Sequence, residues 1–261
     1  MALKATEILE VERDEGIAVL TLNRPAQRNA LSRELMREVV AALDEIRGDE
    51  AVRAVVVAGR GPAFCAGHDL SEMLDLGLED YREIFALCTR MMNVIHELPQ
   101  PVIARVHGMA TAAGCQLVAA CDLAVAGTEA RFATPGVKIG LFCTTPMVEV
   151  ARSIGRKRAL ELLLTGTAIY AETAAAWGLI NRVVAPEDLD SATSELARSI
   201  AAASPLTVAI GKRAFYSQID LGLDGAYEHC QAVMSENATA QDAQEGMSAF
   251  IEKRTPTWRG C

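Results

Sequence analysis

The hydrophobic and polar positions of the first fifty residues predict two strands followed by one helix. Residues 6–14 and 17–23 are rich in apolar and β-branched side chains, and they flank turn-forming residues at 14–16. Residues 31–49 show helical spacing after Ser32, whose side chain is a preferred helix N-cap. The apolar stripe of this helix consists of Leu35, Val39, Leu43 and Ile46.

Two continuous apolar runs follow, and each predicts a strand that is covered on both faces. They are residues 52–59 (VRAVVVAG) and 101–108 (PVIARVHG), separated by a helix predicted over residues 81–96. Residues 122–135 (DLAVAGTEARFATP) add two shorter strands. This alternation of strands and helices is typical of an α/β protein.

The chain becomes mostly helical after Thr144, and three last helices extend to Arg254. We therefore divide it into a core, residues 1–200, and a helical C-terminal region, residues 201–261, within one functional unit. The C-terminal helices are too apolar for a small satellite, so we expect them to contact other copies of the chain. Between Thr144 and this region the pattern predicts helices over residues 156–166, 171–179 and 186–204, the last with Pro186 in its first turn, and a strand over residues 180–184.

The composition changes this picture mainly by exclusion. The 261 residues carry a net charge of −9 and contain no basic run, which argues against nucleic-acid binding. No apolar run reaches membrane-spanning length. The seven cysteines are odd in number and irregularly spaced, with no CxxC pair, so the sequence predicts reduced thiols and no metal site. Residues 1–16 carry neither an apolar signal core nor an Arg-rich transit pattern, from which we expect a cytoplasmic protein.

Two loops rich in small residues follow the two buried strands. They are residues 63–70 (AFCAGHDL) and 108–117 (GMATAAGCQL). Small side chains pack weakly and cost chain entropy, so their use here indicates that the backbone itself must come close to something else. One interpretation is that a helix packs tightly on a strand. The other is that a backbone amide from each loop points into the same cleft, the second at a helix N-terminus, where the pair would stabilise a developing oxyanion. The chain contains no Rossmann fingerprint, P-loop or nucleophile-elbow motif.

These loops, together with residues 130–140 (ARFATPGVKIG) and 162–184, resemble the enoyl-CoA hydratase/isomerase (crotonase) superfamily. The resemblance is colinear from about Asn23 to Arg254, and within the superfamily it is strongest to the enoyl-CoA hydratase domain-containing protein 3 branch. It implies a spiral of ββα units with a helical C-terminal trimerisation region. It also implies acyl-CoA thioesters as ligands, a homotrimer or a dimer of trimers as the assembly, and no cofactor apart from the coenzyme A of the substrate.

The resemblance also implies roles for individual residues. It places the two oxyanion donors at the backbone N–H groups of His68 and Ala113. It makes Arg24 and Arg28 candidates for coenzyme A contacts, and lets Lys253 or Arg254 reach a neighbour's coenzyme A. The other residues implied to bind substrate are Cys65, Ala66, Gly67, Asp69, Leu70, Gly114, Pro135 and Thr144.

The sequence departs from the family pattern at the acid–base positions. Hydratases of the family carry two glutamates, and the corresponding positions here are Gln116 and Gly136. A carboxylate that some isomerases use aligns with Thr144. An amide has no proton that titrates near neutral pH, so Gln116 can hold a water molecule but cannot act as a general base. We therefore expect efficient hydration of an enoyl thioester to be lost.

Other side chains offer substitutes, each with a structural alternative. The ring of His68 could titrate in range or be structural, and Asp69 could act in the site or cap the short helix that begins there. Glu149 could face the pocket or the surface. Cys143 could be a nucleophile or an inert buried thiol, and His107 is expected to satisfy a local hydrogen bond.

Three functions stay open on this sequence. The first is an acyl-CoA enzyme that isomerises, decarboxylates or cleaves its substrate with altered acid–base chemistry. The second is a non-catalytic acyl-CoA binder that modulates lipid metabolism. The third is enoyl-CoA hydration with a water molecule held by Gln116.

Overall fold

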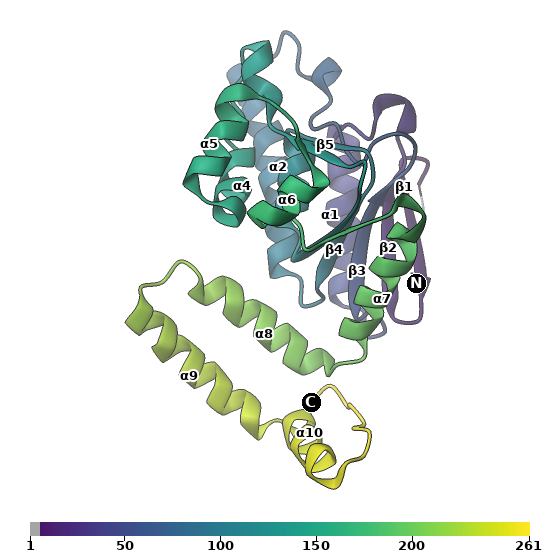
Figure 1. Cartoon of the computed structure of the whole chain (residues 1–261), viewed down its shortest axis with the longest axis vertical. Coiled ribbons are helices and arrows are strands. Elements are labelled where there is room, and N and C mark those ends of the chain that lie inside the picture. Colours follow the sequence, from purple (N-terminus) through teal and green to yellow (C-terminus); the bar gives the residue numbers. More distant parts are fainter. Residues whose placement is uncertain (1–5) are drawn as a thin grey trace.

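The computed structural model describes residues 6–261, so the first five residues of the predicted polar N-terminus lie outside the described part. A six-stranded sheet, in the order β1-β2-β3-β4-β6-β9, forms the centre of the chain (Figure 1). The first two strands pair antiparallel, as the predicted turn requires, and every later pairing in this sheet is parallel. Its strands are β1 (Leu9–Asp14), β2 (Ile17–Leu22), β3 (Ala54–Gly59), β4 (Val102–Val106), β6 (Leu123–Gly127) and β9 (Arg182–Val184).

Helices cover both faces of this sheet, which explains why the parallel strands are apolar throughout. On β3, Val55 and Val57 belong to the large core shared with α1 (Arg33–Arg47) and α2 (Leu78–Glu97). The alternate residues Ala54 and Val56 pack in a smaller core with α7 (Leu189–Ala201) on the opposite face. The α/β class predicted from the sequence is thereby confirmed.

The local signals place the first two helices. The side chain of Ser32 accepts a hydrogen bond from the backbone N–H of Leu35 at 3.1 Å, which confirms the predicted N-cap of α1. The second helix begins earlier than predicted, at Leu78, because the Asp80 carboxylate accepts from the backbone N–H of Gly77 at 3.2 Å. Pro186 begins a separate 3-10 turn, η4 (Pro186–Asp188), ahead of α7 rather than inside its first turn.

A second, three-stranded sheet in the order β5-β7-β8 was not predicted as such. It consists of β5 (Met109–Thr111), β7 (Arg131–Ala133) and β8 (Ile169–Tyr170), and only β7 was expected. The strand β5 lies within the small-residue segment that we interpreted as a loop, and α3 (Ala113–Ala120) begins two residues after it. The remaining elements of this half are η1 (Pro25–Gln27), η2 (Leu70–Glu72), η3 (Pro135–Ile139), α4 (Pro146–Ile154), α5 (Arg156–Thr165) and α6 (Ala171–Trp177).

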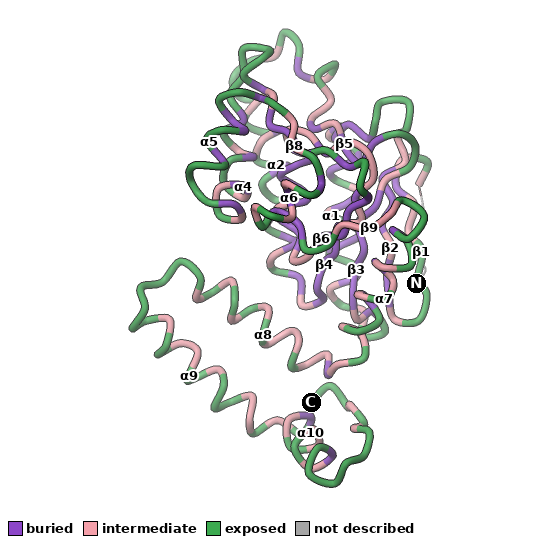
Figure 2. Tube along the Cα trace, viewed as in Figure 1, coloured by how far each residue is buried: buried purple, intermediate pink, exposed green. Residues whose placement is uncertain are grey.

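The last three helices, α8 (Pro205–Gln218), α9 (Leu223–Thr239) and α10 (Gln241–Glu252), project from the core as a separate group (Figure 1). No residue of α8 or α9 is buried, whereas the buried segments concentrate in the sheets and in the helices that cover them (Figure 2). The large apolar side chains that these helices expose include Phe215, Leu223, Tyr227, Met234, Phe250 and Ile251.

The division of the chain at residue 200 stays a prediction, although α7 ends at Ala201 and α8 begins at Pro205. Across residues 6–261 no helix is both long and apolar enough to cross a membrane.

Candidate active site

The first predicted donor, the N–H of His68, lies in a loop that neighbouring backbone holds on both sides. Leu31 donates to the carbonyl of Gly67 at 2.7 Å and accepts from the N–H of Asp69 at 3.1 Å, which forms a short parallel bridge opposite His68. In such a bridge the flanking residues make the hydrogen bonds, so the amide of the central residue points the other way. Among the described residues the N–H of His68 has no acceptor.

The second predicted donor, the N–H of Ala113, is the first amide of α3. The initial amides of a helix have no intrahelical acceptor, and this one finds none elsewhere in residues 6–261. It follows Ala112, whose φ of 51° and ψ of −118° are unusual for a residue with a Cβ. Such backbone conformations cost about 1–3 kcal/mol and concentrate at functional sites. A hydrogen bond from Ala112 N–H to the Ala133 carbonyl at 2.9 Å holds the turn.

Two glycines allow the two loops to approach each other. A Cβ on Gly67 would lie 3.2 Å from the nitrogen of Ala113, and the positive φ of Gly67, 87°, also favours glycine. A Cβ on Gly114 would lie 2.2 Å from the carbonyl oxygen of Cys65. The small residues therefore serve both interpretations of the sequence, since close packing of the helix on the loop also brings the donor segments together.

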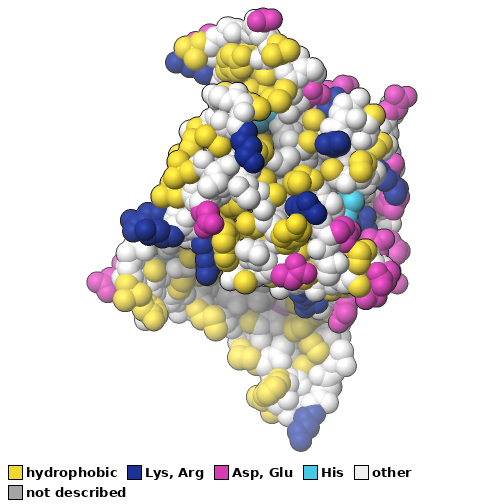
Figure 3. Space-filling model, turned by 45° about the horizontal axis from the view of Figure 1, so that its top comes forward, with side chains coloured by type: hydrophobic (Ala, Val, Ile, Leu, Met, Phe, Trp, Pro, Cys, Tyr) yellow, Lys and Arg dark blue, Asp and Glu magenta, His cyan; other side chains and the backbone are white. Residues whose placement is uncertain are grey.

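An apolar cavity of about 490 Å³ opens beside these two segments. Its lining comes from the loop before η2, from α2, and from the stretch between η3 and α4. Figure 3 shows many hydrophobic side chains on this end of the molecule. The residues that line the cavity are Ala30, Ala66, His68, Leu70, Met73, Phe85, Thr111, Ala112, Ala113, Pro135, Gly136, Lys138, Ile139, Leu141, Phe142, Cys143, Thr144, Thr145 and Pro146.

No Asp or Glu belongs to this lining, and its titratable groups are His68, Lys138 and Cys143. Burial lowers the pKa of His68 to about 4, and the ring packs edge-on against Phe85 with the ring centroids 5.5 Å apart. Burial raises the pKa of the Cys143 thiol. Near neutral pH the cavity therefore offers a neutral imidazole and a thiol beside the Lys138 side chain, and no carboxylate among its lining residues.

The two positions that depart from the family pattern differ in their surroundings. Gln116 lies in α3, is 4% exposed, and has an enclosed Oε1 without a partner among the described residues. Gly136 lies in η3 against the following loop, and a Cβ there would come within 2.9 Å of both the Leu141 carbonyl oxygen and the sulfur of Cys143. The space for a glutamate stem at residue 136 is thus already filled.

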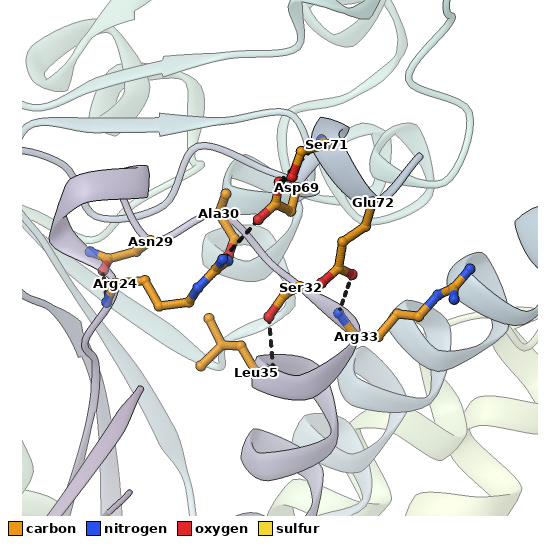
Figure 4. A network of polar contacts seen from close by, with 9 residues as sticks. All are labelled: Arg24, Asn29, Ala30, Ser32, Arg33, Leu35, Asp69, Ser71 and Glu72. Carbon is orange, nitrogen blue, oxygen red and sulfur yellow. Dashed lines mark hydrogen bonds and ion pairs between the residues drawn. The ribbon is translucent and has the colours of Figure 1, made fainter. Parts of the chain in front are cut away.

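The predicted coenzyme A contact at Arg24 is engaged within the protein (Figure 4). Its guanidinium binds the Asp69 carboxylate at 2.8 Å and donates to the carbonyl of Ala30. Asp69 also accepts from the backbone N–H of Ser71, so it caps η2 as the structural alternative predicted. Burial acts to raise the pKa of Asp69, but hydrogen bonds from Ser71 and Arg24 outweigh it and hold the pKa below its usual range.

The other predicted basic contacts are spread over the chain. Arg28 is exposed and ends η1 in the left-handed conformation. Arg254 is paired with Glu245 and Glu252, and Lys253 is exposed directly after α10, a helix that lies far from β5 in Figure 1.

The remaining candidates divide between the cavity lining and other parts of the described chain. Glu149 lies 3.6 Å from Nε2 of His96 and is absent from the cavity lining. The Nε2 of His107 lies 2.8 Å from the carbonyl oxygen of Gly61, which confirms the expected local hydrogen bond. Leu70, Pro135 and Thr144 line the cavity, and their role in substrate binding stays a prediction. No local sequence pattern indicated Met73 or Phe85, which reach the cavity from the segment before α2 and from α2 itself.

Comparison with known proteins assigns the chain to a family. The enoyl-CoA hydratase/isomerase family model matches residues 12–261, so the chain belongs to that family. Within it, the chain is 43% identical over 257 residues to the enoyl-CoA hydratase domain-containing protein 3, mitochondrial, of Xenopus laevis, covering 98% of this chain and 87% of the relative. The predicted resemblance to the family and to this branch is confirmed.

Solved structures agree with this assignment. An enoyl-CoA hydratase from Mycobacterium smegmatis superimposes with a TM-score of 0.94 at 50% identity, covering 96% of this chain and 98% of that one. The human enoyl coenzyme A hydratase domain-containing protein 3 superimposes with a TM-score of 0.94 at 41% identity, covering 96% and 100%. The Xenopus relative is named as mitochondrial, which does not fit the cytoplasmic compartment predicted from the sequence.

Proposed function

We propose that the chain binds acyl-CoA thioesters with the thioester oxygen between the N–H groups of His68 and Ala113 and the acyl chain in the apolar cavity. The observation that carries this proposal is the pair of backbone donors that have no acceptor within residues 6–261, on two loops that approach closely beside that cavity. Two preorganised donors stabilise negative charge on the thioester oxygen, and each such donor is typically worth about 10²–10³ in rate.

In this proposal the chain is an acyl-CoA enzyme that forms an enolate-like state but hydrates enoyl thioesters poorly. Isomerisation, decarboxylation and thioester cleavage all benefit from charge stabilisation at the thioester oxygen. Hydration also needs a base to activate water and an acid to protonate carbon, a contribution of about 10²–10⁴-fold. Neither Gln116 nor Gly136 supplies it, and the described residues that line the cavity include no Asp or Glu.

A second candidate is a non-catalytic acyl-CoA binder that regulates lipid metabolism. Two observations favour it: the lining lacks Asp and Glu, and burial keeps His68 neutral with a pKa of about 4. Both candidates share the binding mode, so they differ only in whether the bound acyl group reacts.

We also propose that the exposed apolar side chains of α8–α10 contact other copies, as a homotrimer or a dimer of trimers. In such an assembly Lys253 of one chain reaches coenzyme A bound to its neighbour, and Arg28 contacts coenzyme A within its own chain. Arg24 contributes indirectly, because its bond to Asp69 fixes the segment that follows His68.

Calorimetry with octanoyl-CoA and with coenzyme A alone tests the binding mode. Ala66 lines the cavity, so Ala66→Leu should fill it and weaken octanoyl-CoA binding at least tenfold, about 1.4 kcal/mol. Ala41→Leu, on the exposed face of α1, is the matched control and should bind as the unmodified protein does. Equal affinity for octanoyl-CoA and free coenzyme A, or no effect of Ala66→Leu, would contradict the proposal.

Two reactions then separate the candidate functions. Deuterium exchange at the α-carbon of octanoyl-CoA, followed by NMR in D₂O, reports enolate formation, and release of free coenzyme A reports thioester cleavage. Either reaction supports the enzyme, and the absence of both supports the binder. Loss of the conjugated absorbance of crotonyl-CoA reports hydration. Hydration within about a hundredfold of typical kcat values, about 1–10³ s⁻¹, would refute the expected loss of this activity.

A further inference from the structure

One thiol occupies the place that the missing second glutamate leaves open. A Cβ built on Gly136 lies 2.9 Å from the sulfur of Cys143, so the sulfur sits where a longer side chain at residue 136 would begin. Cys143 is a free cysteine, lines the cavity, and is 8% exposed. It therefore faces the acyl group of any thioester that binds as proposed above.

The surroundings of this thiol also point to a bound ligand. The N–H groups of His68 and Ala113 lie beside the same cavity and have no acceptor among the described residues. Buried backbone donors are nearly always satisfied by protein, water or ligand, so this pair points to a molecule that brings an acceptor oxygen. A thioester with its carbonyl at the two backbone donors is such a molecule.

The chemistry of a thiol at this position is specific to unsaturated acyl groups. In a 2-enoyl thioester, donors at the carbonyl oxygen withdraw electron density from C3, the carbon that water attacks in hydration. A thiolate is a stronger nucleophile than water, and it needs no separate base once it has lost its proton.

Resting on the function proposed above, we propose that Cys143 captures 2-enoyl-CoA thioesters covalently. The sulfur forms a bond to C3, the C2–C3 π pair moves onto C2, and C2 takes up a proton equivalent to the one that the thiol released. The product is a thioether that retains the intact coenzyme A thioester, so no leaving group, oxidant or reductant is involved.

The second cysteine of this region serves as an internal comparison. Cys115 is fully buried, and burial raises the pKa of its thiol to about 12. Burial also raises the pKa of Cys143, but the backbone of Gly136 acts against this rise and the side chain lies open to the cavity. Capture is therefore expected at Cys143 and not at Cys115, and its rate should rise about tenfold per pH unit below the pKa because the thiolate fraction does.

Mass spectrometry of the reduced full-length chain tests this capture. The reference protein carries Cys230→Ser and Cys261→Ser, since these are the two cysteines that are not buried. It is incubated with (E)-2-octenoyl-CoA, quenched with acid, weighed intact and mapped by peptide. The expected result is one adduct per chain on Cys143 with the mass of the whole thioester. An excess of octanoyl-CoA, which cannot add, should slow its formation at least tenfold.

Further variants separate the site from general thiol reactivity. Adding Cys143→Ser to the reference protein should abolish the adduct while octanoyl-CoA still binds, whereas adding Cys88→Ser should leave the adduct unchanged. The capture is refuted if octanoyl-CoA binds but no adduct forms on Cys143, or if octanoyl-CoA does not slow the adduct. The competition needs no substitution at Cys143, so it stands even if that variant fails to fold. Failure of octanoyl-CoA to bind would instead refute the proposed function itself.

Discussion

The variant Gly136→Ala tests whether other residues of the protein fill the space where hydratases of the family carry their second glutamate. The added Cβ would lie 2.9 Å from the carbonyl oxygen of Leu141 and 2.9 Å from the sulfur of Cys143, well inside ordinary contact distance. Overpacking of this kind costs about 1–3 kcal/mol of the free energy of unfolding. For a chain of this size that corresponds to a fall in melting temperature of about 2–12 °C.

A double-mutant cycle identifies the contact responsible. Cys143→Ala removes the sulfur, so the destabilisation caused by Gly136→Ala should be smaller in that background by at least about 0.5 kcal/mol. Part of the destabilisation should remain, because the added Cβ still meets the carbonyl oxygen of Leu141. Gly140→Ala is the matched control. Its φ is 79° and a Cβ there meets nothing within 4 Å, so its cost comes from the backbone alone and should be the same in both backgrounds.

Thermal unfolding at one fixed protein concentration measures all of these variants, because association with other copies would shift the transition. A Gly136→Ala variant as stable as the parent, or one equally destabilised with and without the Cys143 sulfur, would refute the packing argument. The same argument predicts that a glutamate introduced at residue 136 does not restore hydration unless the loop moves. Gln116→Glu is the cleaner test of a regained base.

Three further predictions concern charge and burial. Burial keeps the pKa of His68 at about 4 in the folded chain, whereas the same histidine is protonated below about pH 6.5 in the unfolded chain. The free energy of unfolding, measured with urea, should therefore fall by up to about 3 kcal/mol between pH 6.5 and pH 4. His68→Asn should abolish this fall. Lys212→Met should cost about 3–5 kcal/mol in the same measurement, since it leaves the half-buried Asp122 carboxylate, 2.6 Å away, without its ion-pair partner. Adding Asp122→Asn should recover much of that loss. The buried Asp242 carboxylate accepts a hydrogen bond from the backbone N–H of Gly260 at 3.0 Å. Asp242→Ala should therefore lower the free energy of unfolding by about 1–3 kcal/mol and speed proteolysis of the C-terminal tail. An unchanged cleavage rate would contradict this role.

The elements that the sequence predicts well are those with a local signal. The cap at Ser32 and the hairpin of β1 and β2 depend on residues within a few positions of one another, and both are confirmed. The strand β5 was missed because its three residues carry no alternation, and its pairing with β7 comes from residues some twenty positions away.

The site shows the same limit. The resemblance to the family supplied His68 and Ala113, but the bond of Arg24 to Asp69 joins residues 45 positions apart, and no local pattern announces it. Similarly, the unusual φ of Ala112 and the contact between Gly136 and Cys143 arise only when separate segments meet. Contacts between distant segments therefore decide whether the position of a lost glutamate is empty or is filled by another residue.

The account depends most on the two backbone N–H groups of His68 and Ala113 polarising one thioester oxygen. Isotope-edited infrared spectroscopy of octanoyl-CoA labelled with ¹³C at C1 measures this polarisation directly. We predict that the labelled carbonyl band moves to lower wavenumber when the thioester binds. The shift should be smaller in Gly67→Ala, where the added Cβ approaches the nitrogen of Ala113. A carbonyl band at the same position in the bound and free thioester, at saturating protein, would contradict the account.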